Sequence, residues 1–276
     1  MPAPRRFTAI VSGAARAGGV LLGGCVFLYG CATGLTVTGE ETTEAAGRRL
    51  TMQRQWLEPR NGGRLVDAAE LEPGDIMLSA AASVPSVGIR LLTLAPVSHA
   101  ALYVGQGQVV EAVGSGVRLR PIAAVIDEEV VIVVLRHPGV DAARRETMRA
   151  FALASVGSRY DHVGIMLQAP VSLQRRLCEL PLLPSSVRDY CIRGVAAIHL
   201  GTARNDRFFC SQFVLEAYRR ADLPLTSADP RWLSPSDILH MREGDVPSVK
   251  SLQSLEYVGH LKFRLPGVAA PTVGGS

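Results

Sequence analysis

The N-terminal segment of the sequence lacks acidic residues, and the whole chain has little lysine. The first 30 residues contain no acidic residue, and the whole chain of 276 residues has only two lysines. Net charge is +4, but three arginines lie in those first 30 residues, which leaves 26 basic against 25 acidic residues in the remainder. A balance so close to neutral gives no electrostatic case for a nucleic-acid partner. With 47% hydrophobic residues, the chain can form one large domain, alone or with short appendages.

The sequence also lacks the spacings that bind metals. It contains no Cys-x-x-Cys pair and no His-x-x-x-His pair. We therefore expect no metal and no other cofactor, so any chemistry depends on the side chains themselves. Internal repeats are absent too, which argues against a solenoid.

The N-terminus has the layout of a secretory leader. Arginines at 5, 6 and 16 are followed by residues 17–37, which carry no charge. Within this run Leu28-Tyr29-Gly30-Cys31 resembles a bacterial lipobox, whose cysteine is acylated. Two alternatives remain open: an uncleaved anchor, because 21 uncharged residues just span a bilayer, and a plain cleaved signal. All three place the rest of the chain in the cell envelope, outside the cytoplasm and on the periplasmic side.

Three cysteines lie beyond the leader. Cys178 and Cys191 either form a disulfide that closes a short loop in an oxidising compartment or are two buried thiols. Cys210 is different, because apolar residues recur after it at 213, 214, 217, 218 and 221, which is helical spacing. A thiol in the first turn of a helix is exposed to the positive end of the helix dipole, which favours the nucleophilic thiolate.

A base for this thiol is predicted on a hairpin. If Gly105-Gln106-Gly107 is a three-residue loop, Ala101 lies opposite Glu111, and alternation places His99 on the same face. His99 and Glu111 are then diagonal neighbours, roughly 7–8 Å apart at the backbone. A carboxylate at that distance would orient the imidazole, as the third member of a nucleophile–base–orienter triad. A two-residue loop would instead move Glu111 to the opposite face.

The remaining patterns indicate an α+β fold, with strands clustered between two helices. The expected domains are a leader at 1–30, a linker and helix at 31–60, a catalytic domain at 61–265 and a flexible tail at 266–276. Helices or helical turns are expected at 40–58, 86–95, 141–156, 210–221 and 234–239. Strands are expected at 76–78, 97–104, 108–113, 117–120, 130–135 and 255–265.

Five segments in fixed order carry a family resemblance: Pro-Gly-Asp-Ile at 73–76, Ser-His-Ala-Ala-Leu-Tyr-Val-Gly at 98–105, Val-Val-Glu-Ala at 109–112, Gly-x-x-Tyr-Asp at 157–161 and Phe-Cys-Ser-Gln-Phe-Val at 209–214. Together they resemble the YiiX/YaeF-like permuted papain-like amidases of the NlpC-type superfamily. The resemblance implies a circularly permuted papain-like fold, with a small antiparallel sheet or open barrel packed on the nucleophile helix. It also implies that Cys210 is the nucleophile, His99 the general base and Glu111 the third polar residue.

The function expected from these features is a cell-envelope cysteine hydrolase, an amidase or peptidase that forms an acyl-enzyme and cleaves a cell-wall peptide or related amide. Two alternatives stay open. One is a thiol acyltransferase or esterase acting on a lipid, as in the related lecithin retinol acyltransferase-like enzymes. The other is an envelope-binding module without activity. The expected partners are a peptide, amide or lipid substrate and a membrane, reached through the lipid or anchor helix.

Overall fold

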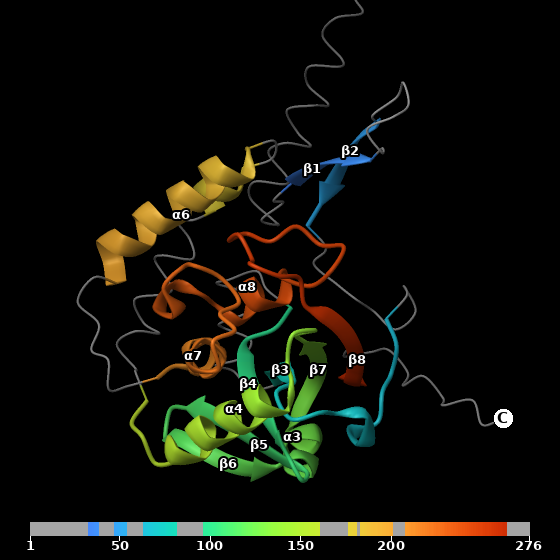
Figure 1. Ribbon diagram of the computed structural model, residues 1–276, viewed down its shortest axis with the longest axis vertical. Coiled ribbons are helices and arrows are strands. Elements are labelled where there is room, and N and C mark those ends of the chain that lie inside the picture. Colours follow the sequence, from blue (N-terminus) through green and yellow to red (C-terminus); the bar gives the residue numbers. More distant parts are fainter. Residues whose placement is uncertain are drawn as a thin grey trace, which may run out of the picture.

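A six-stranded antiparallel sheet organises the molecule. The computed structural model describes residues 33–38, 47–53, 63–81, 96–160, 176–180, 183–200 and 208–263. The order of the strands in the sheet is β6-β5-β4-β3-β7-β8, and each neighbouring pair is antiparallel (Figure 1). The strands are β3 (Ile76–Ala81), β4 (His99–Gly105), β5 (Gln108–Val113), β6 (Gly116–Pro121), β7 (Glu129–Arg136) and β8 (Glu256–Phe263).

One short helix lies between β6 and β7, and the others lie between β7 and β8 in the chain. They are α3 (Ile122–Glu128), α4 (Ala142–Ala154), α6 (Ser185–Leu200), α7 (Cys210–Arg220) and α8 (Pro235–Leu239), with 3-10 turns η2 (Ala68–Glu70), η3 (Arg176–Glu179) and η4 (Pro230–Trp232). Of these helices, α3, α4 and α7 pack against the sheet. The α+β class predicted from the sequence is confirmed. So are the helices expected at 141–156 and from 210, and the capped turn that begins after Ser234.

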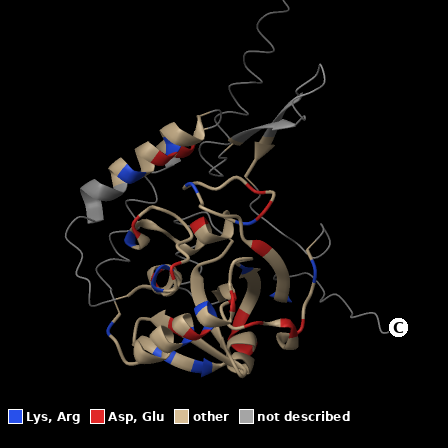
Figure 2. Ribbon diagram, in the orientation of Figure 1, with Lys and Arg blue, Asp and Glu red and all other residues tan. Residues whose placement is uncertain are grey.

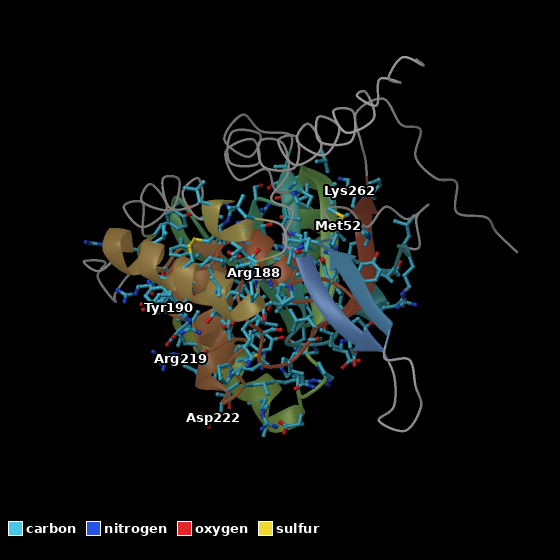
Figure 3. The ribbon with its side chains drawn as sticks, turned by 90° about the horizontal axis from the view of Figure 1, so that it is seen from above. Met52, Arg188, Tyr190, Arg219, Asp222 and Lys262 are labelled. Carbon is cyan, nitrogen blue, oxygen red and sulfur yellow. A yellow bond between two sulfur atoms is a disulfide. The ribbon has the colours of Figure 1, made fainter. Side chains whose placement is uncertain are left out.

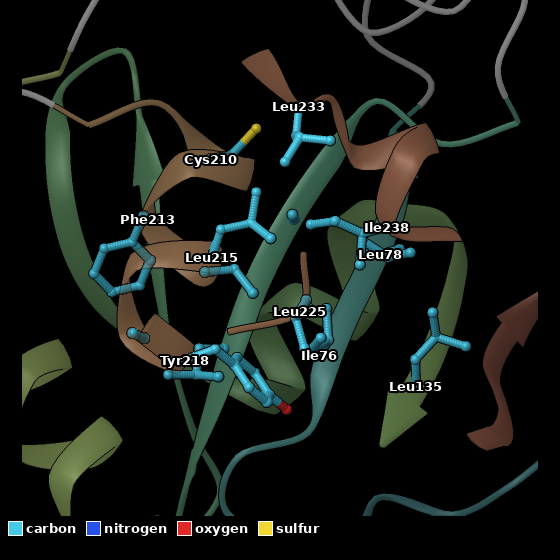
Figure 4. Close-up of a cluster of buried hydrophobic side chains, with 14 of the residues drawn as sticks. Ile76, Leu78, Leu135, Cys210, Phe213, Leu215, Tyr218, Leu225, Leu233 and Ile238 are labelled. Atoms are coloured by element: carbon cyan, nitrogen blue, oxygen red, sulfur yellow. The ribbon is translucent and has the colours of Figure 1, made fainter. Parts of the chain in front are cut away.

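Each face of the sheet carries a cluster of buried apolar side chains. Successive side chains of a strand point to opposite faces, so alternate residues belong to different clusters. On one face Ile76 and Leu78 of β3 pack with Phe213 and Tyr218 of α7 in the larger core cluster (Figure 4). The other face holds a smaller cluster that includes Met77 and is covered in part by α3. The strand that bears the predicted base, β4, therefore lies between the two apolar clusters.

Both ends of α7 are held by side-chain hydrogen bonds to other segments of the chain. Near the end of the helix, the Tyr218 hydroxyl donates to the carbonyl of Gly74, 2.5 Å away. At its start, the Ser211 hydroxyl donates to the carbonyl of Leu233, 2.6 Å away. Asp75, which follows that glycine, is 1% exposed and accepts two hydrogen bonds from the guanidinium of Arg136 on β7. This buried pair supports a structural role for the Pro-Gly-Asp segment.

The helix expected within residues 40–58 is wrong over 47–52. These residues form β2 (Gly47–Met52), which pairs antiparallel with β1 (Thr33–Thr38) in a separate two-stranded sheet. Local propensity is a weak guide for such polar residues, and antiparallel pairing with the preceding strand, β1, decides their conformation. The helix expected at 86–95, the leader with Cys31 and the tail at 266–276 lie outside the described residues.

The charged residues are distributed over the whole described fold. Basic and acidic side chains are interspersed over the described helices and strands (Figure 2). Among the described residues, no helix has the length and apolar character needed to cross a membrane.

Candidate active site

Cys210 is the first residue of α7, and its sulfur is buried at the helix N-terminus. The residue is 3% exposed. The N-cap residue, Phe209, has no side-chain oxygen to accept from the first turn of the helix, so backbone N–H groups there remain available. The N–H groups of Ser211 and of Ala100 on β4 donate toward the Cys210 sulfur. Figure 4 shows this side chain at the edge of the larger core cluster, near Leu233.

His99 begins β4 and connects the thiol to a carboxylate. Its Nε2 lies 2.6 Å from Oε2 of Glu111 on β5. The imidazole also hydrogen-bonds the Cys210 side chain. Since Nε2 faces the carboxylate, Nδ1 is the ring nitrogen left for the sulfur. The three predicted site residues are therefore brought together in one continuous chain of contacts.

The register that places His99 beside Glu111 is the predicted one, but the turn is different. Ala101 pairs with Glu111 and Tyr103 with Val109, as expected. At the tip, however, Gly105 pairs with Gln108, and the register shifts between Tyr103 and Gly105. The loop is thus a two-residue turn, and a bulge in β4 supplies the extra residue that keeps Glu111 on the face of His99. Gln106 and its two flanking glycines all have positive φ, which this turn with a bulge requires.

Two arginines that the sequence did not single out complete the site. Arg118 lies directly opposite Glu111 on β6, and its Nε donates to Glu111 Oε1 at 2.9 Å. Arg120, two residues along on the same face, donates to the same oxygen at 3.3 Å. The sequence does show arginines at alternate positions, 118 and 120, in the strand that follows the hairpin. Only the pairing of β6 with β5 reveals that both arginines lie beside Glu111. Glu111, 2% exposed, therefore has partners for both oxygens.

The electrostatics of the three residues favour an ion pair. Burial disfavours the imidazolium, but hydrogen bonds and charges from Cys210 and Glu111 outweigh it and raise the pKa of His99 to about 10. Burial likewise disfavours the Glu111 carboxylate, but His99 and Arg118 outweigh it and lower its pKa to about 2. For Cys210, burial opposes the thiolate, and the bond and charge of His99 outweigh it, which lowers the thiol pKa. Both shifts act in the direction of a thiolate beside an imidazolium.

A second carboxyl group lies near His99. Glu129 begins β7, and its side chain hydrogen-bonds Ser79, which pairs with His99 across β3 and β4. The other oxygen of Glu129, Oε2, is buried without a hydrogen-bond partner. Burial raises the pKa of this carboxyl above its ordinary value, although the charge of His99 opposes the shift. Sequence reasoning gave no reason to select it, because its proximity to His99 comes from strand pairing alone.

The other candidate cysteines lie away from this chain of contacts. Cys178 and Cys191 are joined by a disulfide that links η3 to α6, with Cα atoms 5.6 Å apart. Cys31, the candidate for lipidation, lies outside the described residues. Within the described part of the chain, no group of three or more histidine, cysteine or acidic residues is arranged to hold a metal ion.

Comparison with known proteins gives one substantial match. No family model matches the chain. It is 36% identical over 206 residues to the probable lipoprotein peptidase YaeF of Escherichia coli K12, and the match covers 74% of each chain. The crystal structure of the metalloprotein YiiX from Escherichia coli O157:H7 is a remote structural neighbour, at 18% identity and a TM-score of 0.37. The match covers 66% of this chain and 88% of that one.

Proposed function

Because the chain belongs to the YiiX/YaeF-like family, we propose that it is a cysteine hydrolase of the cell envelope that cleaves an amide bond in a peptide. The name of its relative, a probable lipoprotein peptidase, supports a hydrolase of the peptidase type and an envelope location. Within the α+β class, we propose the circularly permuted papain-like arrangement. The order of the site residues supports it, since the strand with the base precedes the helix with the nucleophile.

One observation carries this proposal: His99 contacts both the buried Cys210 sulfur and the Glu111 carboxylate. An imidazole between a thiol and a carboxylate can take the thiol proton and be stabilised in its charged form. The raised pKa of His99 and the lowered pKa of Cys210 both support a thiolate nucleophile at neutral pH.

In the first half of the proposed reaction the Cys210 thiolate attacks the carbonyl carbon of the scissile amide. The carbonyl oxygen becomes an oxyanion, which backbone N–H groups at the start of α7, including that of Cys210, would stabilise. The start of the helix supports this role, because the side chain of the N-cap residue, Phe209, accepts no hydrogen bond from the first turn. The His99 imidazolium then donates its Nδ1 proton to the leaving nitrogen, the C–N bond breaks, and an acyl-enzyme remains.

In the second half water resolves the acyl-enzyme. Neutral His99 takes a proton from the water, whose oxygen attacks the thioester carbonyl. The C–S bond breaks, the carboxylic acid product leaves, and Cys210 returns as a thiolate beside imidazolium. Throughout, Glu111 holds the ring through Nε2 and remains ionised, because Arg118 and Arg120 bind its other oxygen.

Selective alkylation tests the nucleophile. Iodoacetamide should modify Cys210 in the native protein at pH 6–7 faster than the same cysteine in the urea-unfolded chain, since a lowered pKa gives more thiolate. Peptide mass mapping identifies the modified cysteine. His99→Ala should remove this excess reactivity. If Cys210 reacts no faster in the folded protein and His99→Ala changes nothing, the enzyme proposal fails and a binding module without activity is favoured.

A substrate panel tests the reaction class. Cell-wall peptides and other peptide amides should be hydrolysed, with release of a free carboxylate, and Cys210→Ser should abolish turnover. Turnover confined to phospholipid or acyl-ester substrates would overturn the choice of an amide and favour lipid-directed acyl transfer.

A further inference from the structure

The N-terminal strands are fastened to one place on the body of the protein. Arg188 of α6 is 2% exposed, and its guanidinium donates to the carbonyl of Thr33 at 3.1 Å and to that of Pro247 at 3.1 Å. Gln53, which follows β2, donates to the carbonyl of Val246 at 2.9 Å. The start of β1 and the end of β2 lie side by side, and this end of the pair is attached to α6 and to the loop at residues 246–248.

This attachment limits where a lipid on Cys31 can enter a membrane. Cys31 is two residues before Thr33, and two residues of extended chain reach only about 7 Å. Thr33 is buried against the body of the protein and bound by Arg188. Acyl chains on Cys31 therefore bring the membrane surface to the part of the molecule around α6, with no long linker between them.

The outer face of α6 exposes two large apolar side chains. Arg188 and Ile192 point inward, whereas Val187 and Tyr190, three residues apart on the other side of the helix, are 49% and 81% exposed. Leu177 of η3 is 67% exposed, and the Cys178–Cys191 disulfide holds η3 beside α6. We call Leu177, Val187 and Tyr190 the α6 apolar face. Figure 3, viewed from above relative to Figure 1, shows Tyr190 and Arg188 on α6, with β1 and β2 nearby.

We propose that the α6 apolar face lies in the headgroup region of the membrane that holds the lipid on Cys31. Tyrosine favours this region, since its ring is apolar and its hydroxyl stays hydrated. So small an apolar face binds a bilayer weakly by itself, but a lipid attached nearby keeps it at high local concentration against the surface. The proposal rests on the envelope location in the proposed function and on acylation of Cys31, which the lipobox-like segment at residues 28–31 predicts. It adds a defined orientation: α6 toward the bilayer, and β6 with the end of α4 away from it (Figure 1).

Fluorescence quenching in vesicles tests this orientation. The full-length acylated protein is reconstituted into phosphatidylcholine and phosphatidylglycerol vesicles, with or without lipids brominated near the start of their acyl chains. Tyr190→Trp adds a reporter on the α6 apolar face. The matched control is Val156→Trp, because Val156 is 43% exposed, also apolar, and adjacent to Gly157, which binds Val117 of β6.

The brominated lipid should quench the tryptophan added by Tyr190→Trp and leave the one added by Val156→Trp unaffected. Equal quenching of the two, or none of either, overturns the proposal when mass spectrometry shows an acyl group on Cys31. The tryptophan added by Tyr190→Trp could instead be protected from a soluble quencher in micelles as well as in vesicles, with self-association that depends on protein concentration. That result would assign the α6 apolar face to contact with a second copy of the chain and would overturn the proposal. If mass spectrometry shows no acyl group on Cys31, the lipid anchor that the proposal requires is absent, and the proposal is overturned. Alkylation of Cys210 is independent of all these outcomes.

Discussion

Glu111 is the residue through which the charges of the site are coupled. One of its oxygens binds His99, and the other binds Arg118 and Arg120, so three basic side chains meet around a carboxylate that is 2% exposed. A buried carboxylate is costly unless it is paired and hydrogen-bonded, and here both requirements are met. The arrangement stabilises the imidazolium, and through it the thiolate of Cys210.

Replacing this carboxylate should therefore weaken the nucleophile. We expect Glu111→Gln to lower the pKa of His99 and raise that of Cys210, with turnover falling about 10²–10⁴-fold. The pH profile of Cys210 alkylation measures the shift, whose midpoint should move to higher pH. Glu128→Gln is the matched control, because Glu128 also binds Arg120 but is exposed and does not contact His99. An alkylation midpoint that is the same in both variants would contradict this role for Glu111.

At the scale of elements, α6 is held in place by bonds of two kinds. The buried guanidinium of Arg188 ties it to β1 and to the loop at residues 246–248. The Cys178–Cys191 disulfide ties it to η3 and places Cys178, which is fully buried, in the core cluster that includes Cys210. These bonds hold a helix that is separated in sequence from the sheet and from α7.

Removing the disulfide should loosen this helix. A crosslink spanning about 13–15 residues restricts the unfolded chain, so Cys178→Ala with Cys191→Ala should lower the free energy of unfolding by about 3 kcal/mol. Urea unfolding followed by circular dichroism gives the value. Dithiothreitol should cause a similar loss in the parent protein and none in the double variant. A parent protein whose unfolding curve is insensitive to the reductant would show that the crosslink does not stabilise it.

At the scale of the whole molecule, folding itself creates the shifted pKa values. Glu111 is paired only when β4, β5 and β6 are assembled, so its pKa is about 2 in the folded chain against an ordinary value of 4.5. A carboxyl whose pKa is lowered by folding contributes stability above the unfolded value and loses it as the pH falls through the folded one. The contribution of Glu111 is therefore complete above about pH 4.5 and disappears toward pH 2.

Acid unfolding measures this contribution. A shift of this size corresponds to about 3 kcal/mol, which the parent protein should lose between about pH 4.5 and pH 2. Glu111→Gln should be less stable at pH 7 and should lose less stability over that interval, because glutamine does not titrate. Urea unfolding at several pH values gives both curves. Parallel curves would show that the stability of the fold does not depend on ionisation of Glu111.

Local patterns were sufficient for several elements and for the approximate positions of the three predicted site residues. Helical spacing after Cys210 predicted α7, and the capping pattern at Ser234 predicted α8, because both depend on residues within a few turns. The hairpin register that pairs Ala101 with Glu111 was also predicted, although the bulge that maintains it was not. The strand β2 was missed although its partner, β1, is the preceding strand, because its polar residues have no strong preference for a strand.

The sequence by itself determined the α+β class and the position of Cys210 at a helix start, because both follow from the periodicity of local segments. It also predicted the pairing of His99 with Glu111, but the bulge in β4 that maintains this pairing appears only in the structure. Only the tertiary structure decided that Arg118 and Arg120 bind Glu111, that Glu129 lies near His99 and that Arg188 holds Thr33. These contacts depend on which strands and helices become neighbours. That choice is made by burial of apolar surface across the whole molecule, which no local pattern encodes.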